Sequence, residues 1–338
     1  MFKKRVSRPI TILNFKIPKP IFYASTAAAA LGLTCIIKEW TGGSKLQPNV
    51  LAEGKVVIIT GANTGIGKET ARDLAKRKAK VYMACRDMKR CEEARSEIVL
   101  DSNNKYVYCR KCDLASLQSV REFVARFKAE QERLDILINN GGVMRTPNSK
   151  TKDGFETQLG VNHLGHFLLT NLLLDRLKES APSRIINVSS VAHKKGIINR
   201  EDLNSDQKYD PAAAYAQSKL ANILFTMELA KKLKDTKVTV NAVHPGIVST
   251  EIIRHMSFFN SWLATILIKP LLWPFIKSPS QGAYTVVYAA LSSKLPNVTG
   301  KYFSNCEEAE VSEAAKDDAT AAWLWAVSER WTRLNTAT

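Results

Sequence analysis

Short apolar segments alternate with amphipathic segments from about residue 51 onward. Each apolar segment is short enough for a β-strand and is followed by a segment with the composition of a helix. Strand-helix alternation on this scale predicts an α/β domain built on a doubly wound parallel sheet. The predicted strands cover residues 55–60, 80–85, 106–112, 134–139, 184–189 and 237–243.

A different pattern occupies the first fifty residues. Residues 21–37 are uncharged and mostly apolar, and a helix of that length spans roughly 26 Å, slightly less than a ~30 Å hydrocarbon core. Basic residues precede this run and nothing acidic occurs before Glu39, a pattern typical of an uncleaved membrane anchor or a mitochondrial targeting region. A loosely docked or disordered tail is the alternative. We predict an N-terminal membrane-anchor helix with a linker in residues 1–50 and a single catalytic domain in residues 51–338.

Composition adds a preference for anionic partners. The chain has 338 residues, 45% of them hydrophobic, and a formal net charge of +17. Such a basic surplus favours phosphorylated cofactors, acidic lipid surfaces or nucleic acid. Nucleic-acid binding is not expected, because the body of the chain shows no basic cluster interleaved with aromatic residues and no reading motif.

The six cysteines show no framework spacing, and a chain of this length does not need disulfides to hold its core. We therefore expect reduced cysteines. Cys109 and Cys112 have the spacing of a metal or redox pair, but in a strand residues three apart point to opposite faces. Without a second pair at zinc spacing, we expect structural cysteines and no metal site.

A glycine-rich turn follows the first predicted strand and opens the first predicted helix. Glycines there let the backbone approach a pyrophosphate, whose charge is favoured at a helix N-terminus. The spacing Gly-x-x-x-Gly-x-Gly differs from the Gly-x-Gly-x-x-Gly fingerprint, but its place between strand and helix strengthens the interpretation. We predict that a dinucleotide binds at Gly61, Asn63, Thr64, Gly65, Ile66 and Gly67.

The end of the second predicted strand indicates which dinucleotide is bound. Arg86 is the first polar residue past that strand, close to where the adenosine ribose sits in such folds. Its guanidinium can pair with a 2′-phosphate, and Lys68 and Lys89 can add positive charge. These residues favour NADP(H) over NAD, whereas the adjacent Asp87 argues in the other direction.

Tyr215 and Lys219 lie four residues apart in a helical stretch, so both side chains share one face. A tyrosine hydroxyl becomes a useful acid or base when a nearby ammonium and a charged nicotinamide lower its pKa. The spacing alone is common on solvated helix faces. Its weight comes from Ser190, which follows a buried strand at the sheet edge where ligands bind and can hydrogen-bond a substrate oxygen or cap the next turn.

Together these segments resemble the short-chain dehydrogenase/reductase family, over about residues 53–310. The resemblance rests on Thr60-Gly-Ala-Asn-Thr-Gly-Ile-Gly67, Asn139-Asn-Gly-Gly142, Asn162, Ser190, Tyr215-x-x-x-Lys219 and Pro245-Gly246. It implies a Rossmann-type fold, with Tyr215 as acid/base, Lys219 on the nicotinamide ribose and Ser190 orienting the carbonyl. It further implies that Asn162 supports a proton-relay water.

The same resemblance implies further cofactor contacts from Asp113 to the adenine, from Thr250 to the carboxamide side of the nicotinamide, and from Pro245 and Gly246. Asn139, in the same set, would stabilise the central sheet. Two departures stand out. Gly141 replaces the usual alanine, which should loosen local packing, and the 25-residue separation from Ser190 to Tyr215 indicates an insertion beside the site.

Further segments resemble the retinol dehydrogenases that reduce retinaldehyde with NADPH. They are Val161-Asn-His-Leu-Gly-His-Phe-Leu-Leu-Thr170, Asn187-Val-Ser-Ser-Val-Ala-His193, Ser218-Lys-Leu-Ala-Asn222 and Ala242-Val-His-Pro-Gly246. The histidines in these segments are expected to serve packing and polar networks rather than a metal. An N-terminal anchor is typical of that group. The aromatic, apolar region 258–277 is either a helical flap packed on the core or a segment that lines a lipophilic pocket or touches a membrane.

The resulting hypothesis is a membrane-associated, NADP(H)-dependent oxidoreductase of retinol and retinal, in the endoplasmic reticulum or the mitochondrion. A reductase of steroids or lipid aldehydes is one alternative. A catalytically weak, nucleotide-binding membrane scaffold is another. The family often dimerises, so a homodimer is possible, and the sequence leaves open the exact substrate and the physiological direction.

Overall fold

The computed structural model describes residues 10–12, 15–248 and 276–334. Within them, the central sheet has eight strands in the order β10-β9-β8-β7-β6-β3-β4-β5. All neighbours are parallel except the terminal pair β9 and β10. The strands are β3 (Val56–Thr60), β4 (Lys80–Cys85), β5 (Val107–Lys111), β6 (Ile136–Asn139), β7 (Ser183–Val188), β8 (Val238–His244), β9 (Tyr302–Ser304) and β10 (Glu307–Glu308).

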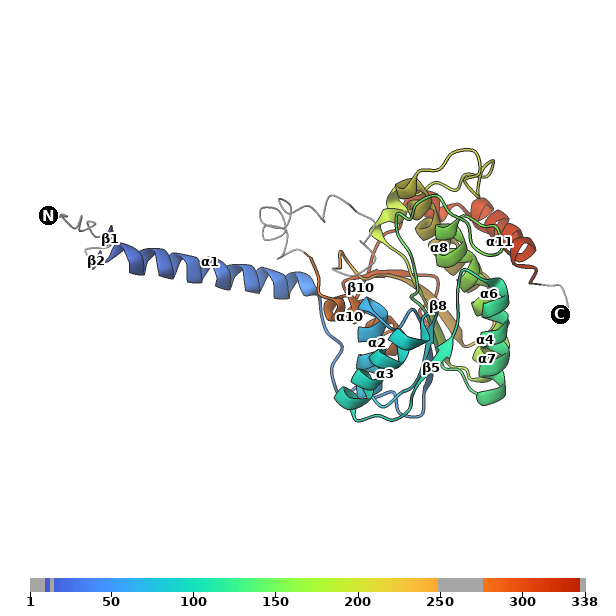
Figure 1. Ribbon diagram of the computed structural model, residues 1–338, viewed down its shortest axis with the longest axis horizontal. Coiled ribbons are helices and arrows are strands. Elements are labelled where there is room, and N and C mark those ends of the chain that lie inside the picture. The colour runs from blue at the N-terminus through green and yellow to red at the C-terminus, as the bar shows by residue number, and fades with distance from the viewer. Residues whose placement is uncertain (1–9, 13–14, 249–275, 335–338) are drawn as a thin grey trace.

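Helices cover both faces of this sheet, as the prediction of a doubly wound fold requires (Figure 1). One face carries α2 (Gly65–Lys76), α3 (Met88–Ser102) and α10 (Pro279–Leu291). The other face carries α4 (Leu117–Glu130), α6 (Gly165–Leu172), α7 (Leu174–Glu179), α8 (Pro211–Lys232) and α11 (Asp318–Thr332). Shorter helical turns are α5 (Thr157–Leu159), a π-helical turn at Gly160–Leu164 and 3₁₀ turns at Val191–Lys195 and Glu313–Lys316.

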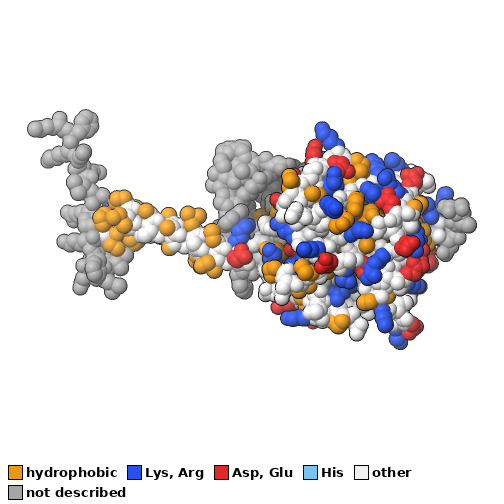
Figure 2. Space-filling view, turned by 90° about the horizontal axis from the view of Figure 1, so that it is seen from below, with side chains coloured by type: hydrophobic (Ala, Val, Ile, Leu, Met, Phe, Trp, Pro, Cys, Tyr) orange, Lys and Arg blue, Asp and Glu red, His pale blue; other side chains and the backbone are white. Residues whose placement is uncertain are grey.

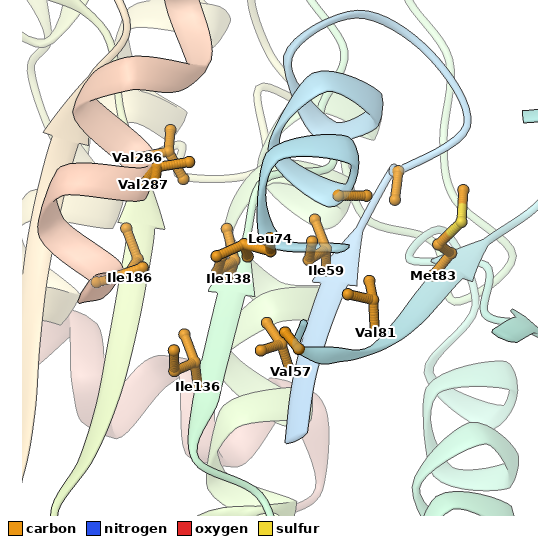
Figure 3. Packing of buried hydrophobic residues seen from close by; sticks show 14 of the residues in the cluster. Val57, Ile59, Leu74, Val81, Met83, Ile136, Ile138, Ile186, Val286 and Val287 are labelled. Carbon is orange, nitrogen blue, oxygen red and sulfur yellow. The ribbon is translucent and has the colours of Figure 1, made fainter. Parts of the chain in front are cut away.

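The strands at the centre of the sheet are apolar on both faces, because helices cover both. In β3, Val57 and Ile59 join Leu74 of α2 and Val286 of α10 in one core cluster (Figure 3). Ile58, between them, points the other way and packs with the aromatic side chains beneath α4 and α8. The alternation fixes which face of the sheet each helix covers.

The order of the strands places a crevice at the centre of the sheet. β3 pairs with β4 on one side and with β6 on the other, so the connections leave it in opposite directions. Ligands of open α/β sheets bind at such a switch point, beyond the carboxyl ends of the strands. The turns after β3, β4, β6, β7 and β8 all meet at this edge.

The N-terminal apolar segment is helical, and α1 (Lys19–Gly42) projects from the domain (Figure 1). A short antiparallel pair, β1 (Ile10–Ile12) and β2 (Phe15–Ile17), precedes it. Leu31, Leu33 and Ile36 are exposed along the helix, which is orange over much of its length in Figure 2. Residues Lys19–Glu39, with mean hydropathy 1.7, are long and apolar enough to cross a membrane.

The cysteines differ in part from the expectation. Cys91 of α3 and Cys109 of β5 form a disulfide, so the prediction of six reduced cysteines is wrong. The pairing arises because α3 packs on the face of β5 to which Cys109 points. Cys112 belongs to the core cluster on the opposite face, as predicted for a residue three positions along a strand.

Candidate active site

A cavity of about 910 Å³ opens at the carboxyl edge of the sheet. Most of the residues predicted from the sequence line it: Gly61, Asn63, Thr64, Gly65, Ile66, Gly67, Arg86, Asp113, Ser190, Tyr215, Lys219, Pro245 and Gly246. Asn139 and Asn162 lie behind the wall. Thr250, like nearly all of the aromatic region 258–277, lies outside the described residues.

The glycine-rich turn has the shape that a phosphate group needs. Gly61 and Gly65 have φ angles of 63° and 56°, in the left-handed region that favours glycine. A Cβ atom on Gly61 would lie 2.8 Å from the Cα of Gly141, and one on Gly67 would overlap the Gly61 carbonyl oxygen. The backbone at the N-terminus of α2 can therefore be approached closely from the cavity, and the turn fits a dinucleotide pyrophosphate.

Thr60, which was not among the predicted site residues, and His166, which was expected in a polar network, hold this turn in place. The hydroxyl oxygen of Thr60 accepts hydrogen bonds from the backbone N–H groups of Asn140 (2.9 Å) and Gly141 (2.8 Å). It also bonds Nε2 of His166 (2.8 Å), whose Nδ1 contacts the carbonyl oxygen of Asn162 (3.0 Å). Burial lowers the pKa of His166 to about 4, so the ring is neutral. Two features of the sequence could have indicated this contact: a polar residue at the end of a buried strand, and a histidine one helical turn after Asn162.

The glycine at position 141 does not leave the predicted gap. A Cβ atom there would lie 2.8 Å from Cδ1 of Leu114 and 3.3 Å from the Thr60 hydroxyl. The Leu114 side chain occupies the space that an alanine methyl group would need. The expected loosening of the packing is therefore absent.

The end of β4 provides positive charge. Arg86 is exposed at the cavity, and Arg90 on the first turn of α3 lines it as well. The Asp87 carboxylate accepts a hydrogen bond from the Arg90 backbone N–H (3.1 Å) and so caps α3. Lys68 instead pairs with Glu97 (2.7 Å), outside the cavity wall. Of the described residues that line the cavity, five are basic and two acidic: Lys38, Arg86, Arg90, Lys219 and Lys277 against Asp87 and Asp113.

Tyr215 and Lys219 share one face of α8, as predicted, and both line the cavity. The Lys219 ammonium lies 5.7 Å from the centroid of the tyrosine ring and donates a hydrogen bond to the carbonyl oxygen of Val188 (3.1 Å). Its side chain is buried, with 3% of the residue exposed, and burial lowers the pKa of Lys219 to about 8. An ammonium has three donors, so donors remain for a ligand in the cavity.

The Tyr215 hydroxyl has a pKa above its ordinary value. Burial raises the pKa, and a hydrogen bond with Ser190 partly opposes that rise. The sequence analysis expected the ammonium and a charged nicotinamide to lower it. In the protein alone, burial is the largest influence on this pKa. The hydroxyl therefore keeps its proton at neutral pH.

Ser190 follows β7 and has the capping role that the sequence allowed for it. Its hydroxyl oxygen accepts a hydrogen bond from the Ala192 backbone N–H (3.2 Å), which caps the 3₁₀ turn Val191–Lys195. Its carbonyl oxygen is bonded to Nδ1 of His193 (2.7 Å), and Nε2 of that ring accepts from the Ser312 N–H (3.3 Å). His193 thus belongs to a polar network that holds Ser190 beside the Tyr215 hydroxyl.

Asn162 and Asn139 organise the site from behind the cavity wall. Asn162 sits in the π-helical turn, where its amide accepts from the Val143 N–H (2.8 Å) and donates to the Val143 carbonyl (3.0 Å) and to Ser218 (2.9 Å). Asn139 donates to Thr170 (2.8 Å) and Asn187 (2.7 Å). The structure thus does not bring Asn139 into the cofactor cavity, and its contacts are those of a residue that joins the sheet to its helices.

Comparison with known proteins agrees with this geometry. The profile of the short chain dehydrogenases matches residues 55–258, which include the glycine turn, Ser190, Tyr215 and Lys219. The chain belongs to the short chain dehydrogenase family. It is an oxidoreductase with the Rossmann-like fold of that family, and a nicotinamide dinucleotide is the cofactor that the family and the glycine turn support.

Within the short chain dehydrogenases the chain falls in the retinol dehydrogenase subgroup. It is 55% identical to retinol dehydrogenase 12 of Mus musculus over 86% of this chain and 90% of the relative. It is 49% identical to retinol dehydrogenase 13 of Homo sapiens over 90% of this chain and 93% of the relative. A crystal structure of an uncharacterized protein from Mycobacterium Paratuberculosis has a TM-score of 0.69 and 37% identity, covering 86% of this chain and 98% of that one.

The insertion between Ser190 and Tyr215 covers one side of this short chain dehydrogenase. The Tyr209 hydroxyl donates to the carbonyl oxygen of Thr146 (2.6 Å) and accepts from the Gln158 amide (3.1 Å). Asp202 accepts hydrogen bonds from three backbone N–H groups of residues 206–208 and closes the loop on itself. The insertion is therefore ordered. It packs against the segment that follows Asn140–Met144, and those residues line the cavity.

Proposed function

We propose that this protein is an NADP(H)-dependent oxidoreductase that interconverts retinol and retinal. The observation that carries the proposal is the meeting of Ser190, Tyr215 and Lys219 in one cavity with the glycine turn. The curated relatives at 49–55% identity over most of the chain are named retinol dehydrogenases, which supports the choice of a retinoid.

Each side chain has a definite part in this reaction. When bound, the nicotinamide dinucleotide supplies or accepts the hydride. Ser190 and Tyr215 hydrogen-bond the substrate oxygen, and during reduction the Tyr215 hydroxyl transfers its proton to that oxygen while the carbonyl carbon gains the hydride. Lys219 binds the nicotinamide ribose and stabilises the tyrosinate that proton transfer leaves behind. Asn162 holds the loop at Val143 and supports a proton-relay water.

The environment of Tyr215 leaves it in the protonation state that reduction of the carbonyl requires. Burial raises the pKa of this hydroxyl, so it starts as a proton donor at neutral pH. The reduced nicotinamide carries no positive charge that would lower that pKa before hydride transfer. A protonated Tyr215 is the form that reduction needs, whereas oxidation of an alcohol begins from the tyrosinate.

Positive charge at the end of β4 supports NADP(H) over NAD. Arg86 and Arg90 line the cavity where a 2′-phosphate would lie. Asp87, which could instead bind a free 2′-hydroxyl, caps α3. Asp113 lines the same end and is placed to contact the adenine. Pro245 and Gly246 are assigned to the nicotinamide side, together with Thr250, which lies outside the described residues.

An apolar wall supports a lipophilic substrate. The described apolar residues of the cavity include Val143, Met144, Val161, Val191, Ile247, Val248 and Ile276. Steroids and lipid aldehydes share this chemistry, so a reductase of such carbonyls is the second candidate. A nucleotide-binding scaffold with little turnover has no chemical need for a buried lysine beside a buried tyrosine.

A substrate panel with both cofactors tests this proposal. The purified full-length protein is incubated in vesicles with NADPH or NADH and with all-trans-retinal, a steroid ketone or a long-chain aldehyde. We expect the highest kcat/KM with retinal and NADPH, and a reduced preference for NADPH in the Arg86→Ala variant. A higher kcat/KM with the steroid or the aldehyde would favour the second candidate, and cofactor binding without turnover on any carbonyl would favour the scaffold.

The N-terminal helix supports membrane association, and the basic flank places the N-terminus on the cytoplasmic side if the helix spans the bilayer. The endoplasmic reticulum and the mitochondrion are both compatible with this composition. A homodimer formed through helices of the core remains part of the proposal on family grounds alone.

A further inference from the structure

The end of helix α1 touches the catalytic domain beside the cavity. The Lys38 ammonium donates to the carbonyl oxygen of Ile276 (2.9 Å), and the Gln281 amide of α10 donates to the carbonyl oxygen of Lys38 (3.3 Å). Beyond the helix, the Arg77 guanidinium donates to the carbonyl oxygens of Leu46 (3.0 Å), Gln47 (2.7 Å) and Val50 (2.8 Å). The segment predicted to be a linker is therefore held to the domain along its length.

Lys277 lies at the centre of these contacts. It is buried and lines the cavity, and its ammonium donates to the carbonyl oxygen of Gly42 (3.0 Å) and to the side-chain oxygen of Asn305 (2.7 Å). A Cβ atom on Gly246 would lie 2.8 Å from Cδ of Lys277, so the lysine stem packs directly on the cavity wall. One side chain thus joins the last residue of α1, the turn after β9 and the Pro245-Gly246 segment.

The helix itself contributes to the wall, since Lys38 lines the cavity. Ile36, 67% exposed, is the last strongly exposed apolar side chain before it. Ile36 and Gly42 are separated by ~9 Å along the helix axis. The apolar surface of α1 therefore ends within about two turns of the cavity.

We propose that Lys277 is a latch that docks the end of α1 onto the catalytic domain, so that the membrane helix forms a fixed part of the cavity wall rather than a flexible tether. The inference deepens the proposed function, on which its membrane part rests. A docked helix keeps the cavity at a fixed distance from the bilayer. A lipophilic carbonyl substrate is concentrated in that bilayer. Lys277 acts through the position of α1 and is a positioning residue.

Cross-linking in the full-length protein tests the latch without any turnover. Cys35 of α1 is the exposed free thiol, whereas Cys85, Cys112 and Cys306 are buried. Cys35 and Ser280 line the same small pocket of about 310 Å³, and Ser293 lies roughly 20 Å further along the direction of α10. The variants Ser280→Cys and Ser293→Cys are treated in vesicles with a thiol cross-linker shorter than that separation.

We expect Cys35 to cross-link efficiently to position 280 and poorly to position 293. Adding Lys277→Met should lower the yield at 280 severalfold, while the surface control Lys294→Met should not. Equal yields at 280 and 293, or a yield at 280 that Lys277→Met leaves unchanged, would overturn the latch.

A second pair of variants approaches the contact from the helix side and does not alter Lys277. A Cβ atom on Gly42 would lie 2.9 Å from Cδ of Gln281, whereas one on Gly32 has no neighbour within 4 Å. Gly42→Val should therefore lower the 35–280 cross-link yield and raise the KM for retinal severalfold with little change in kcat, and Gly32→Val should do neither. If Gly42→Val and Gly32→Val give the same 35–280 cross-link yield and the same KM for retinal, the proposed docking of α1 is contradicted. A wild-type protein that cross-links as expected but does not turn over retinal contradicts the proposed function alone.

Discussion

At the scale of single residues, the buried ammonium of Lys219 lowers the folding stability of the protein but suits the proposed reaction. Its ammonium is buried beside Tyr215, and burial lowers its pKa to about 8 from an ordinary value of 10.5. The charged form, which is proposed to bind the ribose, is therefore disfavoured by the fold that holds it. Sites of catalysis commonly carry such a cost in folding free energy.

Replacing Lys219 by methionine should stabilise the protein and abolish turnover. The difference between the pKa of about 8 in the folded protein and the ordinary value of 10.5 corresponds to ~3 kcal/mol of folding free energy. After the substitution, the Val188 carbonyl oxygen still accepts a hydrogen bond from the Asn222 amide (3.2 Å). Below pH 8, Lys219 is protonated in both the folded and the unfolded wild-type chain, so the full cost of burying its charge destabilises the wild type. As the pH rises from 8 to 10.5 the unfolded chain binds more protons, so the wild type gains stability and the difference shrinks.

Urea unfolding of the cofactor-free proteins at pH 7 and pH 9 measures this effect. We expect Lys219→Met to have the higher free energy of unfolding at pH 7 and a smaller advantage at pH 9. A methionine variant less stable than the wild type at pH 7 would contradict the account of Lys219.

Most of the site residues predicted from the sequence do line the cavity, because glycine turns and strand ends have local signatures. The role of Thr60 was missed because its hydrogen bonds reach residues 80 to 106 positions further along the chain. His166 was expected only in a polar network, without its partner Thr60. The raised pKa of Tyr215 was missed for a similar reason, since burial depends on elements that pack around α8 and not on its spacing to Lys219.

At the scale of elements, a chain of buried amides ties the sheet to the helix that carries Tyr215. Asn139 of β6 donates to Asn187 of β7 (2.7 Å), and Asn187 donates to the Thr226 hydroxyl of α8 (2.9 Å). The Thr226 hydroxyl donates in turn to the Asn222 carbonyl (2.7 Å). These contacts fix how α8 sits on the sheet, and with it the position of Tyr215, the proposed catalytic residue.

Breaking this chain should affect both stability and turnover. Asn187→Leu leaves the buried amide of Asn139 without that acceptor and should lower the free energy of unfolding by ~1–3 kcal/mol. A small shift of α8 should lower kcat more than it weakens cofactor binding. Urea unfolding and steady-state kinetics check both effects against Asn171→Leu, which replaces a half-buried asparagine on α6 that donates to the Phe167 carbonyl within its own helix. Equal effects of the two variants would contradict the role of the amide chain.

The elements of the sheet were predicted to within two residues at nearly every strand end, because central strands are continuous apolar runs. β9 and β10 were missed because segments of three and two residues carry no periodic signal. The disulfide between Cys91 and Cys109 depends on how α3 packs against β5, which no spacing in the sequence encodes.

At the scale of the whole molecule, a basic catalytic domain stands at the end of an apolar helix (Figure 2). The charge distribution favours an anionic cofactor and an acidic lipid surface together. The helix is predicted from residues 1–50 alone, so the segment should direct a carrier protein to a membrane without the domain.

Imaging a fusion of residues 1–50 to a fluorescent protein tests this localisation. We expect a membrane-bound signal that coincides with either the endoplasmic reticulum or mitochondria and that is lost when Leu31 and Leu33 are both changed to arginine. A diffuse signal from the unaltered fusion would contradict the anchor.

The central claim is that Tyr215 is the proton donor in an NADPH-dependent reduction of retinal. The most direct measurement is the rate of NADPH oxidation by the purified full-length protein on addition of all-trans-retinal, compared between the wild type and Tyr215→Phe. We predict retinal-dependent oxidation by the wild type and a kcat lowered by ~10²–10⁴-fold in the variant, because phenylalanine keeps the ring and removes the proton. Turnover by Tyr215→Phe within a few-fold of the wild type would contradict the claim.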